Sequence, residues 1–151
     1  MVMGVSGHFF DERVSLGTFR TRTATLRIVA NPRRSSPGGE RVEPFAGPVA
    51  VLIDEGSGSA SEMFAGGVQA VGRMRVFGSR TLGGVLPASF DRLPNGDVLY
   101  HAFAEFVTAD GTLLEGRGVI PDQAVVLTRQ DLLAGRDPAL DAALEWIAAQ
   151  H

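Results

Sequence analysis

The chain contains 151 residues, of which 44% are hydrophobic and 21% charged, and its formal net charge is −3. This length and composition predict one folded domain spanning residues 1–151, with a sizeable core, and exclude a disordered or fibrous protein. No apolar run approaches the ~20 residues that a membrane-spanning helix needs, and the first residues lack the basic start and apolar stretch of a signal peptide.

The first half of the chain contains two predicted strands. Residues 1–20 carry little pattern, whereas residues 23–30 alternate between apolar and polar, which predicts a strand with one buried face (Ala24, Leu26, Ile28 and Ala30). Residues 31–43 are rich in Pro, Gly, Ser and Arg and predict a mobile loop. Residues 49–53 are apolar without alternation, which indicates a strand covered on both faces inside a parallel or mixed sheet.

A helix and a hairpin are expected next. Phe64, Val68 and Val71 follow a helical spacing, and Gly72 is a typical helix stop. A short strand at 74–77 and a glycine-containing loop at 81–84 follow. Strands at 89–93 and 98–107 flank a Pro-Asn-Gly-Asp turn, which predicts an antiparallel hairpin.

The last part of the chain predicts a turn at 109–111, strands at 112–115 and 123–127, and a C-terminal helix. Asp137 can cap that helix and Pro138 suits its first position, with Leu140, Leu144 and Ile147 on one face. The predicted fold class is therefore α/β, with a mixed sheet, flanking helices and antiparallel hairpins.

Several kinds of chemistry are excluded by residue counts. There is no Cys, and all 14 basic residues are Arg, so disulfides, thiolates, Walker-type phosphate loops and Ser-Lys dyads are excluded. Three scattered His give no metal-ligand spacing, and no motif indicates a cofactor. Arg33 and Arg34 form an isolated pair in an acidic chain, so we expect no nucleic-acid binding.

The segment from Asp54 to Glu62 joins a predicted buried strand to a helix through small residues. Such a junction can hold a serine hydroxyl beside the free backbone N–H groups of a helix start, where an oxyanion would be stabilised. A purely structural interpretation stands beside this one. Ser59 and Glu62 have the spacing of a capping box, which needs no function.

The region from Pro48 to Asp122 resembles the tail-specific, or carboxyl-terminal-processing, serine peptidases, which include the tricorn-type enzymes. Four landmarks match in order: an apolar strand at 47–53, the Ser-Ala-Ser-Glu signature at 59–62, Gly-Ser-Arg-Thr-Leu-Gly-Gly at 78–84, and Glu-Gly-Arg-Gly-Val-Ile-Pro-Asp at 115–122. The resemblance implies the C-terminal portion of a Clp-protease/crotonase-like peptidase domain. It also implies a peptide or protein substrate.

By the same resemblance, Ser59 is the nucleophile, the Ala60 N–H is one oxyanion donor, and Glu115 orients or polarises the site. Ser57 is expected in the turn and Ser61 in the first turn of the helix. Glu62, Gly83 and Gly84 are possible supporting residues. Gly84 stands where one branch carries its dyad lysine, which places the chain with the Lys-less, tricorn-like branch. Pro121 and Asp122 are expected to be structural.

The family's histidine and its D-x-R-x-N-x-G-G strand-turn precede the matched region, so we expect the general base to come from an upstream segment or a partner chain. His8 is expected at a helix end or in the core, His101 in a cross-strand hydrogen bond, and His151 at the disordered terminus. Relatives are frequently exported, but the sequence leaves the compartment open.

Two alternatives to a peptidase remain open. The chain could be an inactive family member that binds a peptide or an apolar ligand, which Gly84 and the missing histidine favour. It could also be a structural fragment whose exposed edge promotes homo-oligomers or pairing with a chain that supplies the missing half.

Overall fold

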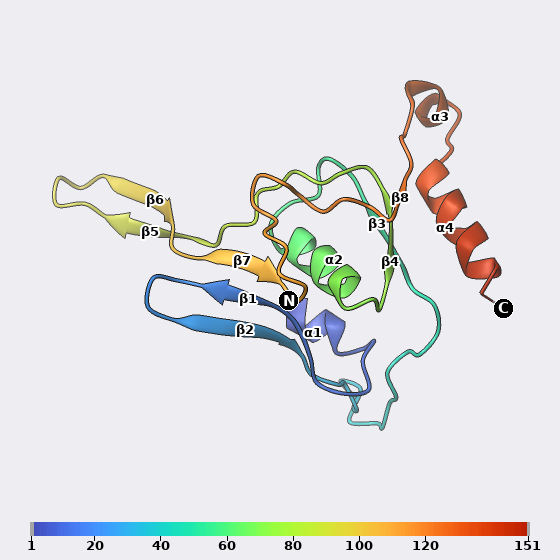
Figure 1. The fold of residues 1–151 in the computed structure, drawn as a ribbon, viewed down its shortest axis with the longest axis horizontal. Helices are drawn as coiled ribbons and strands as arrows, with labels where there is room; N and C mark the ends of the chain where they lie inside the picture. Colours follow the sequence, from blue (N-terminus) through green and yellow to red (C-terminus); the bar gives the residue numbers. More distant parts are fainter. Residues whose placement is uncertain (1, 151) are drawn as a thin grey trace.

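The computed structural model describes residues 2–150, in which α2 (Ala60–Ala70) lies between two small sheets (Figure 1). The antiparallel sheet has the order β2-β1-β7, formed by Thr25–Ala30, Val14–Arg20 and Glu105–Thr108. The parallel sheet has the order β3-β4-β8, formed by Ala50–Ile53, Arg75–Gly78 and Gln123–Ala124. The predicted α/β class is confirmed.

The core forms where α2 meets these sheets, because one face of the helix is apolar. Val68 of α2, Leu16 of β1, Val76 of β4 and Phe106 of β7 are all almost fully buried. Gly67 allows the helix to approach β1 closely, since a Cβ at this position would lie 2.8 Å from the Leu16 Cβ. The packing fixes α2, and with it the segment that precedes the helix.

Strand β1 and the short helix α1 (Val2–Ser6) were missed by the sequence patterns. The pairing of β1 with β2 shifts register between Ser15 and Gly17, so the bulge interrupts the alternation that would identify a strand. For β2 the prediction was correct at Ile28 and Ala30, which are buried, but wrong at Ala24, which is exposed, and at Leu26, which is 65% exposed.

The predicted interior strand is also corrected. β3 is parallel to β4, as expected, but it lies at the edge of its sheet, and its Leu52 is 42% exposed. β4 is the interior strand instead, with Val76 and Phe77 fully buried. An apolar run alone does not distinguish a central strand from an edge strand next to it.

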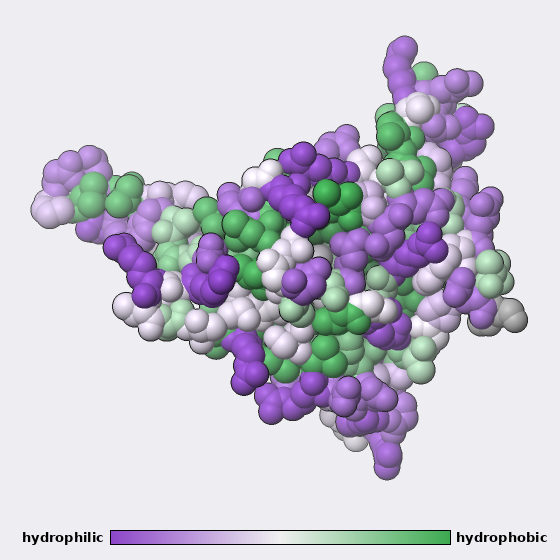
Figure 2. All heavy atoms as spheres, in the orientation of Figure 1, coloured by the Kyte–Doolittle hydropathy of each residue, from purple (hydrophilic) through white to green (hydrophobic). Residues whose placement is uncertain are grey.

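The predicted hairpin forms between β5 (Ala88–Arg92) and β6 (Val98–Ala102) and projects from the body as an arm (Figure 1). The expected long strand at 98–107 is split, because its second part is β7 and pairs with β1 rather than with β5. Apolar side chains are exposed on the arm (Figure 2), where the rings of Phe90 and Tyr100 pack with centroids 4.5 Å apart.

The C-terminal part contains the unpredicted α3 (Arg129–Leu133) and the predicted α4 (Pro138–Ala148), capped by Asp137, whose carboxylate accepts from the Leu140 N–H. The expected apolar face of α4 is wrong: Leu140 and Leu144 are exposed, and Ala143 is buried. The Trp146 ring packs on Phe77, with Arg75 over both rings. The expected strand at 112–115 is reduced to an isolated bridge.

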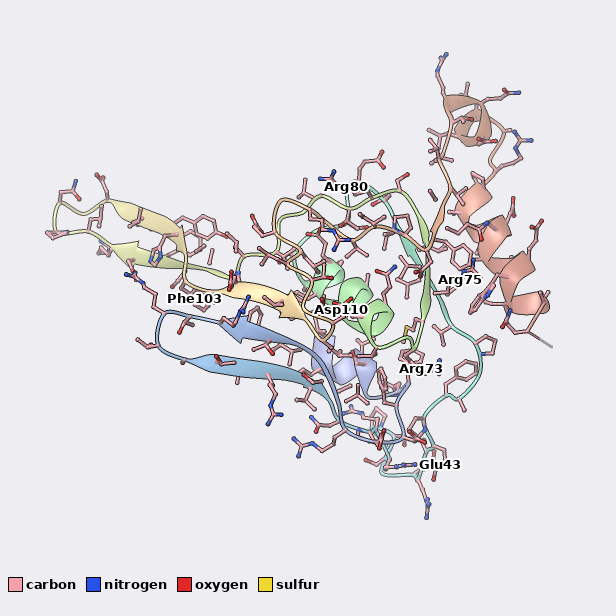
Figure 3. The ribbon with its side chains drawn as sticks, in the orientation of Figure 1. Glu43, Arg73, Arg75, Arg80, Phe103 and Asp110 are labelled. Atoms are coloured by element: carbon pink, nitrogen blue, oxygen red, sulfur yellow. The ribbon has the colours of Figure 1, made fainter. Side chains whose placement is uncertain are left out.

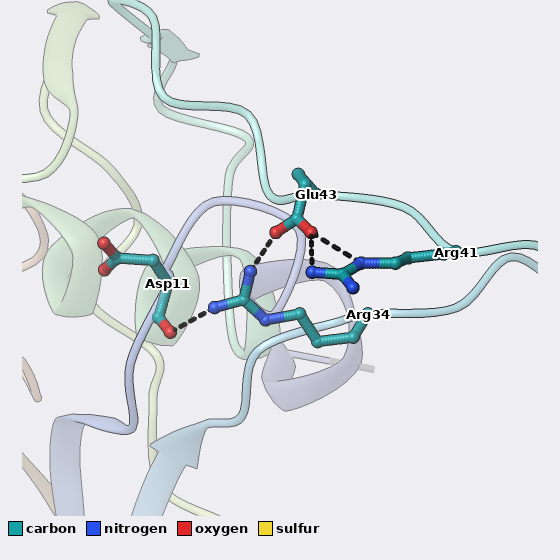
Figure 4. A network of polar contacts seen from close by, with 4 residues as sticks. All are labelled: Asp11, Arg34, Arg41 and Glu43. Carbon is teal, nitrogen blue, oxygen red and sulfur yellow. Dashed lines mark hydrogen bonds and ion pairs between the residues drawn. The ribbon is translucent and has the colours of Figure 1, made fainter.

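Arg73 connects the N-terminal segments to the body of the molecule, and Arg34 and Arg41 form contacts within those segments. Arg73 (Figure 3) donates hydrogen bonds to the carbonyls of Phe9, Phe45 and Gly47. Arg34 pairs with Glu43 and donates to the Asp11 carbonyl, and Arg41 pairs with Glu43 as well (Figure 4). Residues 31–43 form a loop, as predicted; their mobility stays a prediction.

The Glu43 pair makes this loop sensitive to pH. The hydrogen bond from Arg41 lowers the pKa of Glu43 below its ordinary value of 4.5. A depressed carboxyl pKa stabilises the folded state above the unfolded pKa, and this contribution is lost as the pH falls through the folded pKa. We therefore expect the protection factor of the Val42 amide, whose N–H bonds the Arg34 carbonyl, to fall as the pH is lowered below about 4.5. Glu43→Gln should remove that dependence; an unchanged pH profile in this variant would refute the assignment.

Candidate active site

The segment from β3 into α2 contains three serines, and one of them, Ser57, stabilises the turn itself. Asp54 accepts the Ser57 hydroxyl at 2.9 Å and the Gly56 N–H at 3.1 Å through the same carboxylate oxygen, Oδ1. Ser57 is therefore a turn residue, as expected, and its hydroxyl is already engaged. Ser61 lies in the first turn of α2, also as expected.

Ser59 has an unusual backbone. It is the only non-glycine residue within residues 2–150 with a positive φ, at φ 54° and ψ −119°. The Ser61 N–H donates to the Gly58 carbonyl at 3.2 Å, which closes a tight turn with Ser59 at a position that favours glycine. Such a conformation costs roughly 1–3 kcal/mol, and strained residues of this kind cluster at functional sites.

The Ser59 side chain is free. The residue is exposed, and its hydroxyl makes no capping hydrogen bond to α2, although Ser59 is the N-cap residue. Glu62 accepts a hydrogen bond from the Ser59 N–H, at 3.0 Å, as the glutamate of the predicted capping box. The serine therefore keeps its hydroxyl available for another partner.

A donor suited to an oxyanion adjoins this hydroxyl. Within residues 2–150 the Ala60 N–H has no hydrogen-bond acceptor, and it lies at the first position of α2. The N-terminus of a helix carries a partial positive charge, which favours a developing negative oxygen. Ser59 and Ala60 thus bring a free hydroxyl and a free N–H together.

Glu62 connects the start of α2 to the loop at 81–84. Its side chain is fully buried and accepts hydrogen bonds from the N–H groups of Ser59, Gly83 and Gly84 and from the Thr81 hydroxyl. The Ser59 N–H also lies 3.0 Å from the Gly84 carbonyl oxygen. Of the three residues proposed to support Ser59, Glu62 and Gly84 therefore contact it directly, and Gly83 contacts Glu62.

Glu115 lies on the other side of the same loop. One of its oxygens, Oε2, accepts hydrogen bonds from the Val85 N–H at 2.7 Å and the Leu86 N–H at 3.0 Å. Because Gly84 contacts Ser59 and Val85 follows Gly84 directly, Glu115 is connected to the Ser59 turn through two consecutive residues. Its carboxylate holds backbone, a contact that the sequence pattern did not predict.

The turn at 115–122 is hydrogen-bonded to the loop at 81–84 and to the residue that precedes this loop. The Gly116 N–H donates to the Gly83 carbonyl at 2.8 Å, and Arg80 (labelled in Figure 3) donates to the Gly116 carbonyl. Asp122 accepts from the Val76 N–H and the Gln69 side chain. Asp122 is structural, as predicted.

The described histidines are engaged elsewhere or exposed. His101 forms the expected cross-strand contact, with its Nε2 2.7 Å from Asp91 on the arm, and this hydrogen bond raises the pKa of His101. His8 is exposed and follows α1, so of its two expected positions the helix end is correct and the core is not. Neither is hydrogen-bonded to Ser59, and His151 lies outside the described residues.

No cluster of metal-ligating side chains occurs within residues 2–150, and no helix there is long and apolar enough to cross a membrane.

Two pockets flank the Ser59 turn. One, of about 310 Å³, is mostly apolar and is lined by residues of α1, β3 and the first turns of α2, including Ala60 and Ser61. The other, of about 360 Å³, lies between the ends of β3 and β4 and the start of α4, and includes Asp54 and Ser57. Both pockets therefore adjoin the turn that carries Ser59.

Comparison with known proteins connects this geometry to a family. The sequence profile of peptidase family S41 matches residues 3–125. A probable CtpA-like serine protease from Staphylococcus epidermidis is 31% identical over 77 residues, which cover 51% of this chain and 16% of that protein. The chain thus spans a small part of its curated relatives.

Solved structures agree in fold. A putative peptidase from Parabacteroides merdae has a TM-score of 0.80 at 25% identity, covering 99% of this chain and 48% of that one. The photosystem II D1 C-terminal processing protease has a TM-score of 0.66 at 25% identity, covering 83% and 30%. The tricorn protease has a TM-score of 0.68 at 24% identity, covering 99% and 14%. The predicted peptidase fold is confirmed.

Proposed function

The chain belongs to peptidase family S41, and from this we propose that it carries the nucleophile of a serine peptidase site, with Ser59 forming the acyl-enzyme. The observation that carries the proposal is the strained, exposed Ser59 with its hydroxyl free beside the unpaired Ala60 N–H. The names of the relatives, a CtpA-like protease and a C-terminal processing protease, support a polypeptide substrate cut near its C-terminus.

The reaction requires a base. Ser59 Oγ attacks the peptide carbonyl carbon, the carbonyl oxygen becomes an oxyanion at the Ala60 N–H, and the amine leaves with a proton to give the acyl-enzyme, which water hydrolyses. The serine proton must pass to a base, and we propose a histidine from outside residues 1–151 or from a partner chain. Two features support a partner segment: the outer edge of β3 is unpaired within residues 2–150, and Leu52 on that strand is exposed.

The experiment that tests this function is peptide hydrolysis by the protein extended with its upstream coding sequence. We expect cleavage of unstructured polypeptides that leaves new carboxyl ends. The alternative, a binding module without catalysis, is favoured by Gly84 and by the absence of a described histidine on Ser59. Peptide binding by calorimetry without any cleavage in the extended protein would support the module and refute the peptidase.

The role of Glu115 yields a separate prediction. Both of its hydrogen bonds use one oxygen, Oε2, so the carbonyl oxygen of a glutamine can replace it. We expect Glu115→Gln to change the rate of Ser59 labelling by a fluorophosphonate less than about threefold, and Glu115→Ala to lower it about tenfold or more. Equal losses in the two variants would show that the charge matters, rather than the positioning of residues 85–86.

A further inference from the structure

We propose that Glu62 is the positioning residue for Ser59: its buried carboxylate takes over the helix cap and fixes the strained turn, which leaves the serine hydroxyl free. The inference rests on the proposed function, in which Ser59 is the nucleophile. It adds a role that depends on contacts inside the molecule and not on the substrate. The argument starts from how the two carboxylate oxygens are used.

The two oxygens of Glu62 have different partners. Oε2 accepts from the Ser59 N–H and the Gly84 N–H, each at 3.0 Å. Oε1 accepts from the Thr81 hydroxyl at 2.5 Å and from the Gly83 N–H at 2.6 Å. All four partners are donors, and the side chain is fully buried, so only a group that accepts on both sides satisfies them.

The usual N-cap of a helix would occupy the nucleophile. A serine in this position ordinarily accepts a hydrogen bond from the helix backbone through its own hydroxyl. Here the Ser59 hydroxyl makes no such bond, and Glu62 instead returns to the Ser59 N–H. The helix start is therefore connected to the loop through a carboxylate, while the hydroxyl stays exposed.

The same carboxylate sets the position of the nucleophile. The Ser59 N–H faces both Glu62 Oε2 and the Gly84 carbonyl, and Gly84 is itself bound to Oε2. Gly83 is held from its other side by the Gly116 N–H. Releasing Oε2 would let Ser59 leave its positive φ, and this rotation would move both its hydroxyl and the adjoining Ala60 N–H.

The test compares three variants in the extended protein with an intact fold by circular dichroism. Glu62→Gln is nearly isosteric but places an N–H against donors. Glu62→Asp keeps the carboxylate and withdraws it by one methylene. Thr81→Val removes a bond to Oε1 and the acceptor of the Val119 N–H, and it leaves the Oε2 contacts in place. Glu145→Gln, an exposed change on α4, is the matched surface control.

Two readouts separate positioning from stability. We expect both Glu62 variants to lower the rate constant for fluorophosphonate labelling of Ser59 by at least about 30-fold, because a small misplacement of reacting groups has effects of this size. Thr81→Val should lower the labelling rate constant no more than about threefold, even where its unfolding midpoint falls as far as that of the Glu62 variants. In NMR spectra the Ser59 amide should be protected in the unmodified protein and exchange faster in Glu62→Asp.

The outcomes are distinct. Labelling losses that follow the unfolding midpoint equally in the Glu62 and Thr81 variants would overturn the proposal, as would a Ser59 amide that exchanges as fast as the Ala60 amide in the unmodified protein. If Glu62→Gln does not fold, Glu62→Asp and the amide measurement decide. If the unmodified protein is not labelled at all, the proposed function fails, and the amide exchange alone decides whether Glu62 holds the turn.

Discussion

Replacing Ser59 with alanine should abolish peptide hydrolysis and phosphonate labelling in the extended protein, with a loss of at least about 10³-fold in rate. The loss follows from the free hydroxyl at the strained turn beside the Ala60 N–H. The same substitution at Ser57 or Ser61 provides matched controls two residues away on either side. The Ser57 hydroxyl donates a hydrogen bond to Asp54, and Ser61 lies within α2.

These controls make the result specific. We expect Ser57→Ala and Ser61→Ala to retain hydrolysis within about tenfold, because neither hydroxyl is the attacking group and only the shape of the turn is affected. The unfolding midpoint of Ser59→Ala should stay close to that of the unmodified protein. Hydrolysis that survives Ser59→Ala but disappears in Ser57→Ala or Ser61→Ala would show that this other serine, and not Ser59, is the nucleophile.

A large loss of stability is expected for Gly118→Ala. Gly118 has φ +70°, and a Cβ there would lie 2.6 Å from the Thr81 carbonyl oxygen and 2.9 Å from its hydroxyl. The backbone strain and the clash act together, so the free energy of unfolding should fall by about 3 kcal/mol or more.

Gly116→Ala separates the two causes. Gly116 has nearly the same φ, +69°, but a Cβ there would meet no atom within 4 Å. The substitution carries only the cost of the left-handed conformation, about 1–2 kcal/mol. Denaturant unfolding of both variants measures the difference. Equal losses in the free energy of unfolding for Gly116→Ala and Gly118→Ala would mean that the close contact between residue 118 and Thr81 does not hold the loop at 81–84 in place.

Local patterns predicted the elements that carry the site, but not how they meet. The apolar run at β3, the helical spacing of α2 and the turn between β5 and β6 are local features, and each element formed within a few residues of its expected position. β1 was missed because a bulge interrupts its alternation. The buried face of α4 was wrong because Trp146 docks on Phe77, a contact set by tertiary packing.

The sequence predicted which residues belong to the candidate site, but not how they contact one another. Ser59, Glu62, Gly84 and Glu115 were all selected from the sequence, and the fold brings them to one loop. The positive φ of Ser59 and the choice of Val85 and Leu86 as partners of Glu115 depend on contacts between segments 20 to 30 residues apart. No local pattern contains such information.

Mapping the modified serine tests the central claim most directly. The extended protein would be treated with a fluorophosphonate, digested, and analysed by tandem mass spectrometry across residues 54–62. Phosphonate on Ser59 alone, absent after prior unfolding, is the result expected for a nucleophile activated by the fold. Label on Ser57 or Ser61, or equal label on the unfolded protein, would contradict the assignment of Ser59.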